Sequence, residues 1–244
     1  MDPSLAPIPL MVVGLLIMLL TLRRFDGFFK ENSLFFLFIA GMIIGFVSIL
    51  LENLISPLEG SFSTVDKVLT IYLLESLVYI IGSSILAEGF KTVVINLPRF
   101  RQKREATFMG FGLGIGFGAT ASIMPFFKFV DYVYPRGIVI PVSIAMIYIL
   151  VNGATGLVLG SGSARGATIT SFAVALGIHS IFSSVILGGV FLSHHESPYL
   201  YLAVMVGGIL LAIALYLLSL KSFYWGLPDE EKKRVRRALR RDRG

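Results

Sequence analysis

The stretch LAEGFKTVVINLPRFRQKREATFMGFGLGIGFGATASI, residues 86–123, decides how the rest of the chain folds. It joins the end of an apolar segment that carries Glu88 and Lys91 to a second apolar segment through a basic loop. The second segment has glycine at every even position from 110 to 118. Because every spacing is even, these glycines cannot form the GxGxxG fingerprint of a dinucleotide site, which needs an odd step after its second glycine.

On a helix, these glycines form two flat faces that point in nearly opposite directions, at about 100° per residue. In lipid, small residues allow neighbouring helix backbones to come close and make van der Waals contact. We therefore expect a helix over residues 106–129 at the centre of a bundle, packed on both sides. The glycines expected to make these contacts are Gly110, Gly114 and Gly118 on one face and Gly112 and Gly116 on the other.

The composition is that of a membrane protein that crosses the bilayer several times. Hydrophobic residues make up 55% of the 244 residues and charged residues only 15%, and the mean hydropathy is +0.83. Several apolar runs approach the length of about 20 residues that a spanning helix needs. The chain has no cysteine, which excludes disulfides, thiolate metal sites and cysteine nucleophiles. We expect an all-α, multi-pass protein of the cell membrane, with the lipid bilayer as its surroundings.

The apolar runs predict seven transmembrane helices. The expected ranges are 5–22, 34–55, 68–94, 106–129, 138–159, a sixth that begins after a GSGSARG loop at 160–166 and ends near Phe191, and 198–218. These helices form one domain, residues 1–222, followed by a basic tail, residues 223–244.

The basic residues predict the orientation, because inner loops carry an excess of lysine and arginine. With seven spans and the N-terminus outside, 18 of the 21 basic residues lie inside. Only Lys67, Lys128 and Arg136 remain outside. The tail is then cytoplasmic and contacts anionic lipid headgroups, which is a better explanation of its charge than nucleic-acid binding.

Polar residues within the predicted spans mark the candidate site, since each is costly in lipid unless it is paired or faces a cavity. Glu88, Asn152 and His179 lie at similar depths in the inner half, so we expect Glu88 and His179 to share a cavity open to the cytoplasm. Glu75 lies about 20 Å along the helix from Glu88 and belongs elsewhere. Two simpler interpretations stay open: an ion pair of Glu88 with Lys91 at the interface, and a histidine satisfied by a hydroxyl group.

Four segments resemble known membrane proteins: AEGFK at 87–91, GFGATAS at 116–122, NGATG at 152–156 and IHSIFSSVILGG at 178–189. They resemble the PrsW family of membrane proteases and, more closely, the seven-span scaffold subunit of gamma-secretase. PrsW proteins have two adjacent glutamates, two spacers and lysine, of which Glu88 and Lys91 match. The scaffold subunit has a histidine in each of its fifth and sixth helices. His179 matches the second of these, and Asn152 stands in place of the first.

This chain also departs from the PrsW pattern. Ala87 replaces the first glutamate, and Ala121 and Ser122 stand where PrsW proteins have glutamate and asparagine. The resemblance implies a peptidase centre with Glu88, His179 and Asn152 in catalytic positions and Lys91 in support.

If the centre binds a metal, the resemblance implies zinc on Glu88 and His179, but a catalytic zinc needs about three protein ligands and asparagine is a weak third. A glutamate and a histidine could instead activate water by general-base catalysis. The loop residues His194, His195 and Glu196 lie at the opposite end of the sixth helix, where histidines are commonly only solvated.

Three functions stay open, and the residues do not decide whether the chain is an enzyme. The first is an intramembrane endopeptidase, and the second is a non-catalytic scaffold that binds transmembrane helices through its glycine faces. The third is a transporter or light-driven protein, for which the last span lacks the lysine of a retinal Schiff base and the chain shows no inverted repeat. We expect a protein that handles membrane-embedded polypeptides and has transmembrane polypeptide helices as partners.

Overall fold

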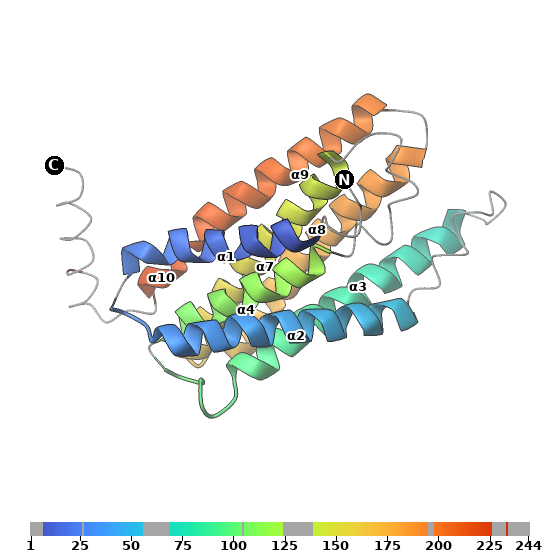
Figure 1. The fold of residues 1–244 in the computed structure, drawn as a ribbon. Helices are drawn as coiled ribbons and strands as arrows, with labels where there is room; N and C mark the ends of the chain where they lie inside the picture. Colours follow the sequence, from blue (N-terminus) through green and yellow to red (C-terminus); the bar gives the residue numbers. More distant parts are fainter. Residues whose placement is uncertain are drawn as a thin grey trace.

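The computed structural model describes residues 7–25, 27–55, 69–103, 105–123, 139–194, 198–225 and 233. These residues form seven long helices and two short ones (Figure 1). The long helices are α1 (Pro7–Leu22), α2 (Glu31–Ile55), α3 (Leu69–Ile95), α4 (Ala106–Ala121), α7 (Val139–Ala164), α8 (Thr168–His194) and α9 (Pro198–Ser219). The short ones are η2 (Arg23–Phe25) and α10 (Ser222–Trp225).

The helices form a bundle of membrane type. Five of them, α2, α3, α7, α8 and α9, are long and apolar enough to cross a bilayer, and α1 and α4 contain shorter apolar helices. Large apolar side chains such as Phe36 and Leu210 lie more than half exposed on the outer surface, where lipid would cover them. The expectation of an all-α, multi-pass membrane protein is confirmed at this level.

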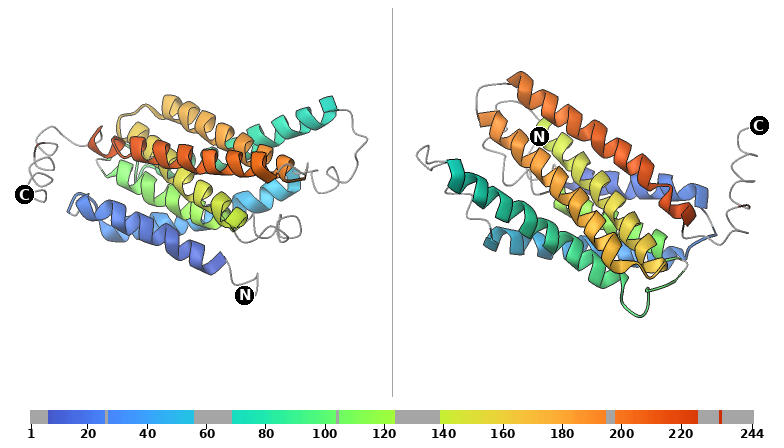
Figure 2. Two further views of the ribbon diagram at one scale, coloured as in Figure 1. Left: turned by 90° about the horizontal axis from the view of Figure 1, so that it is seen from above. Right: turned by 180° about the vertical axis from the view of Figure 1, so that it is seen from behind.

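Helix α4 lies at the centre of the bundle (Figures 1 and 2). It packs mainly against α7 on one side and α2 on the other, and α1 also lies against it. Helices α8 and α9 cover α7, while α3 packs against α2 and α8. All 16 residues of α4 are buried. A helix without a polar face belongs inside the bundle rather than at its surface.

The glycines of α4 are positioned at backbone-to-backbone contacts. A Cβ atom on Gly110 or Gly114 would collide with the backbone of α7, at Gly156 and Asn152, and one on Gly118 would lie 2.9 Å from the Ile149 Cα atom. The opposite face meets α2. There, a Cβ on Gly116 would collide with the Phe38 carbonyl, and one on Gly112 would lie 2.7 Å from a Leu34 methyl. Both glycine faces are therefore occupied by helices of this chain.

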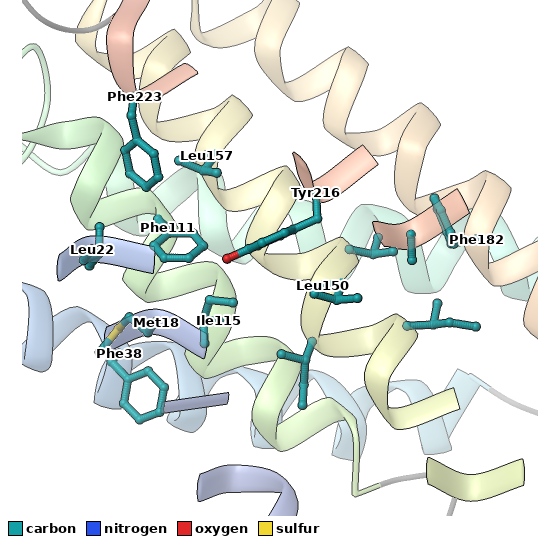
Figure 3. Packing of buried hydrophobic residues seen from close by; sticks show 14 of the residues in the cluster. Met18, Leu22, Phe38, Phe111, Ile115, Leu150, Leu157, Phe182, Tyr216 and Phe223 are labelled. Carbon is teal, nitrogen blue, oxygen red and sulfur yellow. The ribbon is translucent and has the colours of Figure 1, made fainter. Parts of the chain in front are cut away.

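The apolar core surrounds this central helix. Side chains from α1, α2, α4, α7, α8 and α9 meet in one cluster, part of which Figure 3 shows. Tyr216 of α9 reaches toward Phe111 of α4, with ring centroids 6.2 Å apart, and its hydroxyl bonds Thr21 of α1 at 2.6 Å. At one end of the bundle, Phe223 of α10 stacks on Phe108 of α4 at 4.9 Å.

The prediction of a loop at GSGSARG, residues 160–166, is wrong. Helix α7 continues through this sequence to Ala164, only a short turn follows, and α8 begins at Thr168. The small residues serve close packing: a Cβ on Gly160 would collide with the Ala106 carbonyl, and Ser163 donates to the Ile95 carbonyl at 3.3 Å. The turn is made at Gly166, whose φ of 72° is the left-handed conformation that favours glycine.

Two predicted boundaries extend beyond the described residues. Helix α4 ends at Ala121 and a turn follows at Ser122 and Ile123, where the sequence predicted helix, while the rest of the expected range, 124–129, lies outside the described part. Of the expected tail, Phe223 is fully buried in the core, so the packed part of the chain continues past residue 222 into α10. Residues 226–244, apart from Lys233, lie outside the described residues.

Candidate functional site

The polar residues singled out in the sequence meet between α3, α7 and α8. Glu88 and Lys91 lie one turn apart on α3, with their side chains directed into the bundle. Asn152 comes from the middle of α7, and His179 from α8. Glu88, Lys91 and Asn152 are completely buried, and the His179 side chain is 7% exposed. The structure therefore brings together all four residues from three helices.

Lys91 makes hydrogen bonds to three of the side chains in this cluster. Its Nζ donates to Glu88 Oε1 at 2.6 Å, to Asn152 Oδ1 at 2.8 Å and to Thr155 Oγ1 at 2.8 Å. These three bonds use every N–H of the ammonium group. The Phe117 ring of α4, centred 5.0 Å from Nζ, adds a cation–π contact. The lysine is thus fully satisfied without water.

The amide and hydroxyl groups of α7 are held by their own helix. Asn152 Nδ2 donates to the Tyr148 carbonyl at 2.9 Å, which turns its Oδ1 toward Lys91. Thr155 donates to the Asn152 carbonyl at 3.3 Å. Thr155 was missed in the sequence, although its spacing of three residues from Asn152 places the two on one helix face. This spacing is the signal that could have identified it.

His179 contacts the same carboxylate oxygen as Lys91. Its Nδ1 lies 2.7 Å from Glu88 Oε1. An ionised carboxylate only accepts hydrogen bonds, so we assign the imidazole proton to Nδ1. Among the residues that the structure describes, no hydrogen bond involves Nε2, whose lone pair is then available as a base. A carboxylate that fixes the tautomer of a histidine in this way is a recurrent arrangement in catalytic sites.

Glu88 has one oxygen that lacks a partner. Its Oε2 is buried and has no hydrogen bond to any described residue. Buried polar atoms are nearly always bonded, so an unbonded carboxylate oxygen marks a position for a donor such as water or a peptide N–H. This atom lies on the same carboxylate that holds His179. The centre therefore combines a fully bonded cation, a buried carboxylate oxygen without a partner and an imidazole nitrogen without a hydrogen bond.

Hydrogen bonds link the ends of the helices that carry the site. Between the site and the loop ends of α3 and α8, Thr168 Oγ1 donates to Asn96 Oδ1 at 2.9 Å and Ser163 bonds the Ile95 carbonyl. The expected cavity open to the cytoplasm is therefore wrong, because Glu88 is fully buried. The alternative interpretation was an ion pair of Glu88 with Lys91 at the membrane interface. The ion pair is present, but neither side chain reaches the surface.

No family model, curated protein or solved structure matches this chain. The resemblance to the PrsW family and to the gamma-secretase scaffold subunit therefore stays a prediction, as do the catalytic roles of Glu88, His179 and Asn152.

The donor set does not fit a catalytic zinc ion. The described residues contain no group of three histidine, cysteine, aspartate or glutamate side chains that could hold a metal. Lys91 places its charge 2.6 Å from Glu88 Oε1, so a zinc ion bound to this carboxylate would lie next to a cation. A second cation there would meet strong repulsion in a buried site. Of the loop residues considered in the sequence, His194 ends α8, while His195 and Glu196 lie outside the described residues.

Proposed function

We propose that this chain handles membrane-embedded polypeptides as an intramembrane endopeptidase that uses His179 as a general base. The observation that carries the proposal is the Nδ1–Oε1 contact of 2.7 Å between His179 and Glu88. It leaves Nε2 unprotonated and directs the negative charge of Glu88 to the opposite side of the ring. A carboxylate bonded to Nδ1 holds the imidazole in the tautomer that can take a proton from water at Nε2.

The proposed reaction is hydrolysis. Water gives a proton to His179 Nε2 while its oxygen bonds the carbon of a peptide carbonyl, and Glu88 stabilises the imidazolium that forms. The proton then passes from Nε2 to the leaving amine as the C–N bond breaks. Lys91 acts as a positioning residue, because its ammonium donates to Glu88 Oε1 and fixes the carboxylate beside His179. Asn152 and Thr155 hold Lys91 in place.

The proposal includes an orientation. With seven spans and the N-terminus outside, the centre lies in the cytoplasmic half of the membrane, beneath the basic loop between α3 and α4. Its substrates are then transmembrane helices that unwind in the inner leaflet. They reach the site from the side of α8, where His179 retains its small exposed fraction.

A helix-binding scaffold is the second candidate, and the saturated Lys91 favours it. A fully bonded, buried ion pair that links three helices is also what a purely structural tie would show. However, the glycine faces that the sequence offered for binding partner helices are occupied by α2 and α7. A scaffold would have to use other surfaces. The described helices give no support to the transporter, the third function that the sequence left open.

The two candidates differ in what the dyad variants lose. We expect purified wild-type protein in lipid vesicles to cleave a fluorogenic transmembrane peptide, and His179→Ala to abolish cleavage. Glu88→Gln keeps an acceptor for Nδ1 but removes the charge, so cleavage should fall about 100-fold or more. The control is Ser184→Ala on the exposed side of α8, which should cleave as wild type. If wild type and His179→Ala cleaved the peptide at the same rate, measured at the same concentration of folded protein, the peptidase proposal would be wrong and only the scaffold function would remain.

A further inference from the structure

A cavity of about 340 Å³ lies between α1 and α9, away from the Glu88 centre. Its walls are apolar and aromatic, and this volume falls within the ~300–1,000 Å³ of small-molecule sites. The residues that line it include Leu20, Phe25, Leu217, Leu220 and Tyr224. Leu20 and Leu217 are 68% and 57% exposed, so the cavity opens on the lipid-facing surface of the bundle.

The cavity contains one polar pair. Thr21 of α1 and Tyr216 of α9, which also line it, share a hydrogen bond of 2.6 Å. Two hydroxyl groups that share one hydrogen bond retain a second O–H that can donate to another acceptor. A mostly apolar wall with one fixed donor suits a hydrophobic chain that carries a carbonyl group.

Basic residues flank the cavity at its loop end. Arg23 lies in η2 between the lining residues Thr21 and Phe25, and Lys221 follows the lining residue Leu220. Both side chains are exposed. Basic groups at a membrane surface attract anionic headgroups. Positive charge therefore lies next to the apolar cavity at the level where a lipid headgroup would be.

We propose that this cavity binds one anionic phospholipid. An acyl chain fills the space between α1 and α9. An ester carbonyl accepts a hydrogen bond from the free O–H of the Thr21–Tyr216 pair, and Arg23 and Lys221 bind the phosphate. The proposal is independent of peptidase activity. It gives the lipid the role of completing the contact between α1 and α9, which otherwise pack on α4 and on α7 and α8, respectively.

The single tryptophan of the chain, Trp225 in α10, provides the measurement. Full-length protein in detergent micelles is titrated with phosphatidylglycerol or phosphatidylcholine that carries brominated acyl chains, which quench tryptophan fluorescence. We expect saturable quenching by phosphatidylglycerol, with half-saturation at a concentration at least about tenfold lower than for phosphatidylcholine, because two basic residues contact the headgroup. Equal half-saturation by the two lipids would overturn the proposal.

Two pairs of variants separate the cavity from general lipid contact. Arg23→Gln with Lys221→Gln should reduce the preference below about threefold, whereas the matched pair Arg99→Gln with Arg101→Gln in the α3–α4 loop should retain it. Leu220→Phe fills the cavity and should abolish saturable quenching, whereas Leu210→Phe on the lipid-facing side of α9 should not. An unchanged preference in the first pair would assign the effect to the basic tail and overturn the proposal. The proposal would also be overturned if Leu220→Phe and Leu210→Phe bound phosphatidylglycerol with equal affinity.

Discussion

Replacing Lys91 by methionine tests whether the buried network stabilises the bundle. The change keeps most of the side-chain length and removes the ammonium group with its three hydrogen bonds. It leaves the Glu88 carboxylate as a buried charge whose only hydrogen-bond partner among the described residues is His179. Removing one partner of a buried ion pair typically costs about 3–5 kcal/mol, most of it from the charge that stays behind. We expect Lys91→Met to lose a stabilisation of this size.

The double variant Glu88→Gln with Lys91→Met tests whether the loss of stability in Lys91→Met comes from the unpaired charge of Glu88. It removes both charges, and the glutamine oxygen can still accept from His179 Nδ1. Because no unpaired charge is buried, the double variant should be more stable than Lys91→Met alone. Two contacting residues that act as a unit typically couple by about 0.5–3 kcal/mol, and the coupling here should lie at the upper end of that range or above it.

The assay is reversible unfolding of the purified protein in mixed micelles, followed by circular dichroism as the fraction of denaturing detergent rises. Lys103→Met in the exposed loop after α3 is the matched control and should change stability by less than about 0.5 kcal/mol. The reasoning would be refuted if Lys91→Met were as stable as Lys103→Met. It would equally fail if the double variant were less stable than Lys91→Met.

Two further predictions concern the bundle. Gly114→Leu should lower folding yield and cost more than the typical ~1–3 kcal/mol of overpacking, because its Cβ would collide with the backbone of α7 at Asn152; Gly207→Leu on α9, where a Cβ meets open space, should unfold like wild type. Single cysteines at Ser63 and Arg101 in this cysteine-free chain should be labelled by an impermeant reagent from opposite sides of the membrane, and labelling of both from outside would contradict the proposed orientation.

The sequence predicts the helices well because lipid makes apolar run length a direct measure of a span. It fails at GSGSARG because glycine and serine are read as loop residues in soluble proteins, whereas in a membrane bundle they form close helix contacts. Gly160 and Ser163 are at such contacts, with the start of α4 and the end of α3. The even glycine spacing of α4 contained enough information to predict packing on two faces.

The site could be predicted only in part. Depth along each helix placed Glu88, Asn152 and His179 at one level, but depth does not give helix rotation, which decides whether side chains meet or face solvent. The expected open cavity failed for this reason. Lys91 was expected to support the site or to reach the interface, yet it turns inward because Asn152 and Thr155 of α7 supply two acceptors beside Glu88. These acceptors come from a helix about 60 residues away in sequence, a pairing that no local pattern encodes.

The most direct test of the Glu88–His179 centre is the tautomer of His179, measured by nitrogen-15 NMR on protein labelled at histidine. The chain has three histidines, so His179→Gln assigns the signal by its loss. We predict that the neutral form of the ring carries its proton on Nδ1, which faces Glu88, and leaves Nε2 unprotonated. A neutral ring with the proton on Nε2 would contradict the account, because Nδ1 would then face Glu88 without a proton and His179 could not act as the base.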